Sequence, residues 1–156
     1  MAADLAIKRV LVPTDFSPYS LKALRYARAF AQQTGARLTL LHVIDPGIFV
    51  YPDDAYHVPN IPSQQEIFAV ADQRLKRLVA DELPGETADG VVRFGNPAVE
   101  IVRYAHDEDF DLIAIATHGR TGLAHLFMGS VTEKVVRKAP CPVLVVKDPE
   151  HEFVRP

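Results

Sequence analysis

Hydrophobic positions recur with two different periods in this chain, and segments of the two kinds alternate from one end to the other. Short apolar runs such as Val10–Val12 and Leu112–Ala116 have the length of β-strands. Between the runs, apolar residues recur every three to four positions, as they do over Ala23–Ala31, which is the spacing of one helix face. The pattern predicts four helices that separate five strands, at about residues 9–13, 38–44, 90–94, 111–117 and 143–146.

The predicted helices begin with residues that can satisfy the free N–H groups of a first turn. Ser17-Pro18 and Asn96-Pro97 each place a capping side chain before a proline that suits the first helical position. Ser63 and Ser130 are each followed three residues later by a glutamate, which is the spacing of a capping box. In the last helix, the residues expected to face inward are Val131, Val135, Val136 and Ala139.

Five strands separated by four helices predict right-handed crossovers and a parallel sheet. The uninterrupted run Leu112–Ala116 is typical of a strand covered on both faces. We therefore expect one α/β domain over residues 1–156, with a core at about residues 7–147: an open, doubly wound, five-stranded parallel sheet with helices on both faces. Residues 45–62 carry four prolines and three aromatic residues and are expected to form a mobile loop. Residues 148–156 are expected to form a polar tail.

Composition and charge argue against several classes of protein. Seventeen basic and twenty acidic residues give a net charge of −3 and a pI near 6.0, whereas nucleic-acid-binding domains need a basic surface. The longest apolar runs have five residues, far fewer than the ~20 that span a bilayer. The single cysteine, Cys141, excludes an intrachain disulfide and is interpreted as a small apolar residue. The first residues lack a signal-peptide pattern, so we expect a cytoplasmic protein that binds neither nucleic acid nor membranes.

Residues suited to binding phosphate lie where the predicted strands end. Thr14 and Asp15 follow the first strand, His118 and Gly119 follow the fourth, and Gly129 precedes the last helix. Ligands of open parallel sheets bind beyond the carboxyl ends of the strands. Glycines allow a close approach, and the free N–H groups at a helix start attract anions, so the pattern predicts a phosphate site. Neither G-x-x-x-x-G-K-[ST] nor G-x-G-x-x-G occurs, which argues against a P-loop hydrolase and a Rossmann dehydrogenase.

Several segments together resemble the universal stress protein family. They are residues 10–17 (VLVPTDFS), 41–45 (LHVID), 116–119 (ATHG), 129–133 (GSVTE) and 140–146 (PCPVLVV). The resemblance covers about residues 7–147 and implies a Rossmann-like fold of the adenine nucleotide alpha-hydrolase-like type. It also implies binding of ATP or another adenine nucleotide, with Mg²⁺ or Mn²⁺ bridging the phosphates, a role in stress response or signalling, and a homodimer formed through Val143–Val146.

The resemblance implies a role for each residue that matches the family's binding pattern. Asp15 would lie against the nucleotide, Val43 would contact the adenine through its backbone, and the end of the fourth strand would lie beside the sugar. The glycine loop and the start of the last helix would hold the phosphates, and Arg120 is either a phosphate contact or a solvated charge. The full set is Pro13, Thr14, Asp15, Val43, Ile115, Ala116, His118, Gly119, Arg120, Gly129, Ser130, Val131 and Thr132.

One departure from the family pattern and several alternatives remain. Ala116 stands where the family's first loop glycine is found, and alanine fits there unless the backbone needs a positive φ. No catalytic or metal-ligating set is predicted: Asp15 and His118 are the only visible candidate bases, so any ATP hydrolysis should be slow. Asp15 could also serve only as a helix cap. A nucleotide-free dimeric adaptor of the same family stays open, as does a receiver-like signalling domain, although no Asp follows the third strand at Phe94–Asn96.

Overall fold

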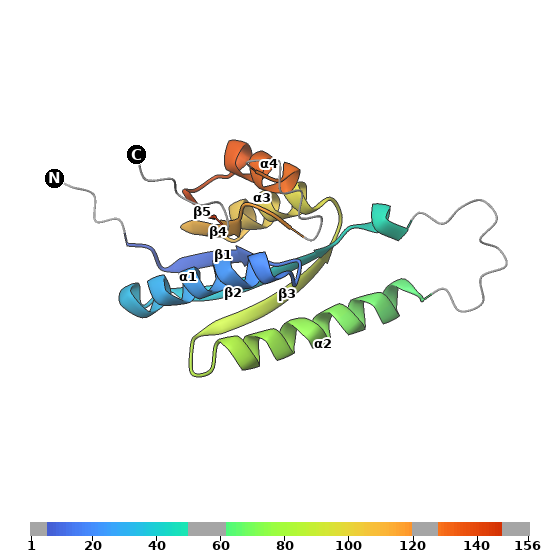
Figure 1. Ribbon diagram of the computed structural model, residues 1–156, viewed down its shortest axis with the longest axis horizontal. Helices are drawn as coiled ribbons and strands as arrows, with labels where there is room; N and C mark the ends of the chain where they lie inside the picture. Colours follow the sequence, from blue (N-terminus) through green and yellow to red (C-terminus); the bar gives the residue numbers. More distant parts are fainter. Residues whose placement is uncertain (1–5, 50–61, 120–127, 148–156) are drawn as a thin grey trace, which may run out of the picture.

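Five parallel strands form one sheet in the computed structural model, which describes residues 6–49, 62–119 and 128–147. The strands lie in the order β3-β2-β1-β4-β5 (Figure 1). This is the order of the first five strands of a Rossmann sheet, and it confirms the predicted fold class. A receiver-like domain would have the order 2-1-3-4-5, so that alternative does not fit. The strands are β1 (Arg9–Pro13), β2 (Arg37–Ile44), β3 (Ala88–Phe94), β4 (Leu112–Ala116) and β5 (Val143–Val146).

Four helices cover the two faces of the sheet. The helices α1 (Pro18–Thr34) and α2 (Gln64–Glu82) pack on one face. The helices α3 (Pro97–Asp107) and α4 (Ser130–Lys138) pack on the other, where Figure 1 shows them beside each other. A short 3-10 helix, η1 (Pro46–Phe49), follows β2. No helix in the described part of the chain is long and apolar enough to cross a membrane.

Alternation along the central strands divides the core between the two faces. In β1, Val10 and Val12 belong to the cluster beneath α1 and α2, whereas Leu11 belongs to the cluster beneath α3 and α4. The same division holds in β4, where Leu112 faces the first cluster and Ile113 the second. Because successive side chains of a strand point to opposite faces, a continuous apolar run supplies both layers at once.

Most of the predicted helix starts are confirmed. The Ser17 and Asn96 side chains accept hydrogen bonds at the starts of α1 and α3, and the capping box of Ser63 and its glutamate is complete. The capping box predicted at Ser130 is wrong. The N-cap of α4 is Gly129, so Ser130 is already the first residue of the helix. The predicted inward direction of Val136 in α4 is also wrong. Its side chain is 42% exposed, and Thr132 is buried on the inner face instead.

The ends of the predicted pattern are only partly described. β5 lies at an edge of the sheet, as its position near the end of the chain suggested. The predicted loop of residues 45–62 begins with η1, so its first residues have a helical turn. Residues 50–61 of that loop and the tail at 148–156 lie outside the described residues.

Candidate functional site

The carboxyl ends of β1 and β4 lie next to each other where the strand order reverses. The chain leaves β1 toward α1 on one face of the sheet and leaves β4 toward α4 on the other. Connections that diverge in this way open a crevice above the two strands, which is where sheets of this kind bind ligands. The predicted segments Thr14–Asp15, His118–Gly119 and Gly129–Ser130 all adjoin this crevice.

Asp15 and Gly119 meet across the crevice although they lie far apart in the sequence. The Asp15 carboxylate accepts a hydrogen bond from the N–H of Ser17 through Oδ1, at 3.0 Å. Its other oxygen, Oδ2, is so close to Gly119 that a methyl group built on that glycine would lie 2.8 Å away. Because Gly119 does not have a positive φ, this close approach, and not the backbone conformation, favours glycine there. Ser17, and not Asp15, is the N-cap of α1.

The loop after β4 returns to the crevice at Gly129. Its N–H donates to the carbonyl oxygen of Thr117 at 2.7 Å, and a methyl group built on Gly129 would lie 3.2 Å from that oxygen. As N-cap of α4, Gly129 brings no side chain to cap the helix. The N–H groups of Ser130, Val131 and Thr132 therefore start the helix without an intrahelical acceptor, and the helix dipole adds positive potential. This arrangement can bind an anion.

A buried side chain ties the start of α4 to the end of β4. The hydroxyl of Thr132 donates to the carbonyl oxygen of Ala116 at 2.7 Å. Ala116 has an ordinary strand backbone, and its methyl group packs in a small cluster with Ala23 and Val146. Alanine in place of the expected glycine therefore causes no backbone strain, and its methyl group is turned into the core.

The backbone of Val43 also faces the crevice. Pairing of β2 with β1 ends at Leu41, whose carbonyl oxygen accepts a hydrogen bond from the N–H of Thr14 at 2.9 Å. The backbone N–H and C=O groups of residues two apart on a strand point to the same side. The N–H and C=O of Val43 are therefore directed to the same side as those of Leu41, toward β1, but they lie beyond the last residue pair of β1 and β2. The carbonyl of Ile44 follows this alternation, because it accepts from Gly95 on the β3 side at 3.0 Å.

The remaining predicted residues surround this arrangement or lie outside it. Pro13 is the buried last residue of β1, and Ile115 is buried in β4 against the α3–α4 layer. His118 is half-buried, with its ring edge-on to an α1 tyrosine at a centroid distance of 6.0 Å. Val131 packs partly against the α3–α4 layer, which leaves its backbone as the group available to a ligand. Arg120 lies outside the described residues.

Two residues that the sequence analysis did not select support the loop after β1. The ring of His42 donates through Nδ1 to the carbonyl oxygen of Thr14 at 2.8 Å. The Thr14 hydroxyl in turn lies 3.0 Å from the hydroxyl of Ser20 in α1. The second missed residue, Phe16, has a φ of 63°, and its ring contacts that of His42 at a tilt of 41°. A polar histidine inside an otherwise apolar strand was the available signal for His42, but nothing local predicts the backbone of Phe16.

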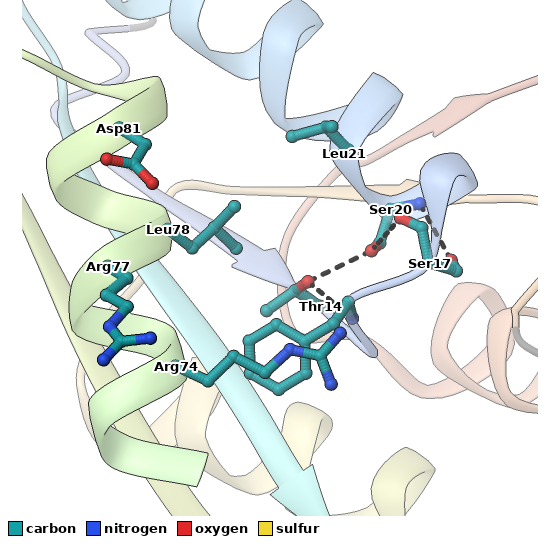
Figure 2. Close-up of a pocket in the computed structure, with 9 residues that line it drawn as sticks. Thr14, Ser17, Ser20, Leu21, Arg74, Arg77, Leu78 and Asp81 are labelled. Carbon is teal, nitrogen blue, oxygen red and sulfur yellow. Dashed lines mark hydrogen bonds between the residues drawn. The ribbon is translucent and has the colours of Figure 1, made fainter. Parts of the chain in front are cut away.

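A cavity of about 230 Å³ lies between α1 and α2, beside the loop after β1. Figure 2 shows Arg74, Arg77 and Asp81 on α2, facing Thr14 and Ser20 on the other side of this cavity. Its walls therefore belong to the face of the sheet opposite to α4. Its volume is below the range of about 300–1,000 Å³ that is usual for pockets that bind small molecules.

The described side chains do not assemble a metal centre. Within residues 6–49, 62–119 and 128–147, no group of three or more His, Cys, Asp or Glu residues could hold a metal ion. Mg²⁺ commonly binds through one or two carboxylates together with the phosphates of a substrate.

Cys141 lies outside the crevice and is not activated. Its half-buried side chain packs against the α3–α4 layer. Burial raises the pKa of its thiol, and the negative charge of Asp111 raises it further. A raised pKa leaves less of the reactive thiolate, as befits a residue that fills space.

Comparisons with known proteins agree with this architecture along nearly the whole chain. The sequence model described as "Universal stress protein family" matches residues 6–147. Universal stress protein MJ0531 of Methanocaldococcus jannaschii is 34% identical over 149 residues, which cover 93% of this chain and 85% of the relative. The solved structure of protein MJ0577 superposes with a TM-score of 0.77 at 33% identity, over 92% of this chain and 97% of that one.

Two structural neighbours were solved with adenine nucleotides. One is a universal stress protein from Archaeoglobus fulgidus in complex with dAMP, with a TM-score of 0.65 over 91% of this chain and 99% of that one. The other is a universal stress protein in complex with cAMP, with a TM-score of 0.64 over 90% of this chain and 97% of that one. Both are 21% identical to this chain, so they show a shared fold.

Proposed function

Because the chain belongs to the universal stress protein family, we propose that it binds ATP or another adenine nucleotide in the crevice above β1 and β4. The close approach of Asp15 to Gly119 is the observation that carries the proposal. It places an acceptor for ribose or adenine donors directly beside a backbone that a phosphate can approach. The nucleotide complexes of two structural neighbours support the choice of an adenine nucleotide.

The phosphates would lie against the start of α4. The backbone N–H groups of Ser130, Val131 and Thr132 would donate to phosphate oxygens, with the exposed Ser130 hydroxyl as a further donor. The Thr132 hydroxyl already donates to the Ala116 carbonyl, so Thr132 would contribute through its N–H. Mg²⁺ or Mn²⁺ would bind together with the nucleotide through phosphate oxygens, which are ligands that these hard cations prefer.

The adenine would lie toward β2. The backbone N–H and C=O of Val43 extend past the end of β1, where they can pair with the base as a strand backbone pairs with its neighbour. Asp15 would then stand between the base and the phosphates, with one oxygen occupied by the Ser17 N–H and the other near Gly119. The half-buried His118 would flank the sugar from the β4 side.

We further propose a binding protein for stress response or signalling, cytoplasmic and dimeric, that hydrolyses ATP slowly at most. A fast hydrolase needs a base placed to activate water, and the candidates in the crevice are Asp15 and His118. One Asp15 oxygen already accepts from the Ser17 N–H, and the other packs against Gly119. The dimer would form through β5.

Titration of the purified chain with ATP and Mg²⁺ tests the proposal, with Gly119→Val and Gly129→Val as site variants. Valine at either position would occupy space that lies 2.8 Å from Asp15 Oδ2 or 3.2 Å from the Thr117 carbonyl, so both variants should lose ATP binding. Gly35→Ala is the control: it strains a left-handed residue at the far end of α1 and should bind ATP like the wild type. Wild-type affinity in the folded valine variants would contradict the proposed site.

A nucleotide-free dimeric adaptor is the competing function within the same family. It predicts no saturable binding of ATP, ADP, AMP or cyclic AMP by the wild-type chain at millimolar concentration. The same titration, repeated with these four nucleotides, therefore separates the two functions.

A further inference from the structure

Phe16, which follows Asp15 directly, has a backbone conformation that phenylalanine rarely adopts. Its φ of 63° lies in the left-handed region, where a bulky side chain is a true outlier. Outliers of this kind persist only where the surrounding structure holds them, and they concentrate at functional sites. The question is what holds this one.

The aromatic ring of Phe16 contacts two side chains from separate elements. The ring of His42 in β2 lies at a centroid distance of 4.4 Å and is tilted by 41°. The guanidinium carbon of Arg74 in α2 lies 4.3 Å from the centroid of the Phe16 ring. Figure 2 shows Arg74 reaching from α2 toward Thr14. The contact between the two rings and the cation–π attraction therefore restrain the Phe16 ring, and the ring restrains the backbone to which it is attached.

Hydrogen bonds also restrain the loop after β1 that contains Phe16. The N–H of Phe16 donates to the Thr14 hydroxyl at 3.1 Å, and His42 donates to the Thr14 carbonyl at 2.8 Å. The N–H of Ser17 donates to the Asp15 carboxylate at 3.0 Å. Asp15 thus lies between two residues whose backbones are both constrained, and its Oδ2 atom lies close to Gly119.

We propose that Phe16 is a positioning residue for nucleotide binding: its clamped ring holds the left-handed backbone that directs the Asp15 carboxylate toward Gly119. The proposal rests on the proposed function. It concerns a residue that lines the cavity between α1 and α2, on the face of the sheet opposite to α4. Release of the ring would let the backbone relax to a negative φ and turn Asp15 away.

Three substitutions at position 16 separate the ring from the backbone. Phe16→Tyr keeps the ring and should bind ATP within about twofold of the wild type. Phe16→Ala loses the ring, and alanine disfavours a positive φ, so it should bind at least about tenfold more weakly. Phe16→Asn also loses the ring, but asparagine tolerates the left-handed region, so it should recover part of the lost affinity. Wild-type affinity in Phe16→Ala, or equal losses in Phe16→Ala and Phe16→Asn, would overturn the proposal.

A matched pair on α2 tests the clamp from its other side. Arg74→Ala removes the cation over the ring and should weaken ATP binding, whereas Arg77→Ala, one turn along the same helix, should leave it unchanged. Ile101→Ala controls for stability, because it opens the core on the other face of the sheet, in the cluster beneath α3 and α4. If Ile101→Ala weakens ATP binding as much as Arg74→Ala does, lost stability explains the effect and the proposal is wrong.

A readout in the nucleotide-free protein separates this inference from the proposed function. In ¹H–¹⁵N spectra without ligand, Phe16→Ala should shift the amide resonance of Gly119, because Asp15 moves away from it, and Phe16→Tyr should leave that resonance in place. An unmoved Gly119 resonance in folded Phe16→Ala would overturn the positioning role. Failure of the wild type to bind ATP would instead contradict the proposed function and leave this readout valid.

Discussion

At the scale of single residues, Ala116 is the instructive case for the proposed phosphate site. Judged by motif alone, it breaks the glycine pattern of the family. In the structure, its backbone is that of an ordinary strand and its methyl group packs with Ala23 and Val146. Gly119 is the opposite case, because one methyl group there would lie 2.8 Å from Asp15 Oδ2, so the carboxylate would have to shift. The two glycine positions of one motif thus have different physical requirements.

Restoration of the family glycine by Ala116→Gly should therefore leave ATP affinity within about twofold. It should cost roughly 0.5–1 kcal/mol of unfolding free energy, because glycine weakens a strand interior. Denaturant unfolding and ATP titration of the same preparations measure both quantities. A large gain in affinity would mean that the alanine obstructs the nucleotide, against the packing described above.

At the scale of elements, the sequence predicted what depends on local chemistry and missed what depends on distant contacts. Strand β1 and the capping box at Ser63 followed from apolar runs and neighbouring side chains. The inner face of α4 did not, because a hydrogen bond to the Ala116 carbonyl turns Thr132 inward. The backbone conformation of Phe16 could not be predicted from the local sequence either, because the side chains that contact its ring, His42 and Arg74, come from β2 and α2.

The capping box of α2 should give stability that depends on pH. A hydrogen bond from the Ser63 N–H, followed by one with the Ser63 side chain, lowers the pKa of Glu66. The pKa of Glu66 is lower in the folded state than in the unfolded state. Its contribution to the free energy of unfolding is therefore present above the unfolded-state pKa and is lost as the pH falls through the folded-state pKa. Glu66→Ala should thus be less stable than the wild type at pH 7, with a difference that shrinks at about pH 3.

Denaturant midpoints at the two pH values measure this dependence, with Gln65→Ala as the control. Gln65 lies in the same first turn but does not titrate, so its effect should stay constant. Ser63→Ala should cost about 1 kcal/mol at pH 7, the usual value for loss of a cap. A Glu66→Ala difference that is constant over this pH range would contradict the role of the charged capping box.

At the scale of the whole molecule, the topology accounts for both the site and the proposed dimer. The strand order brings β1 and β4 together at the crevice and leaves β5 at an edge. The composition of β5, four apolar residues, makes an uncovered edge a liability for aggregation unless another chain pairs with it. Antiparallel pairing of two β5 strands about a twofold axis would satisfy both edges. The sequence predicted a doubly wound parallel sheet but not the order of its strands, because that order depends on contacts between distant parts of the chain.

Leu144→Lys should convert the dimer to a monomer. Leu144 lies in the middle of β5 and is 36% exposed, so lysine fits the single chain but would place two like charges in the paired edge. Val136→Lys is the matched control, since Val136 is similarly exposed but belongs to α4 and not to the edge strand. Sedimentation equilibrium should give a dimer for the wild type and for Val136→Lys. A wild-type species of 17.3 kDa at micromolar concentration would contradict the dimer.

The central claim is that an adenine nucleotide binds at the reversal of strand order, and the most direct measurement is an assigned ¹H–¹⁵N spectrum recorded during addition of ATP and Mg²⁺. We expect saturable shifts at the amides of Asp15, Val43, Gly119 and Ser130, which adjoin the crevice from three strands and one helix. The far ends of the same strands, such as Arg37, should be unaffected. Unchanged spectra at millimolar ATP, or shifts confined to the cavity between α1 and α2, would contradict the claim.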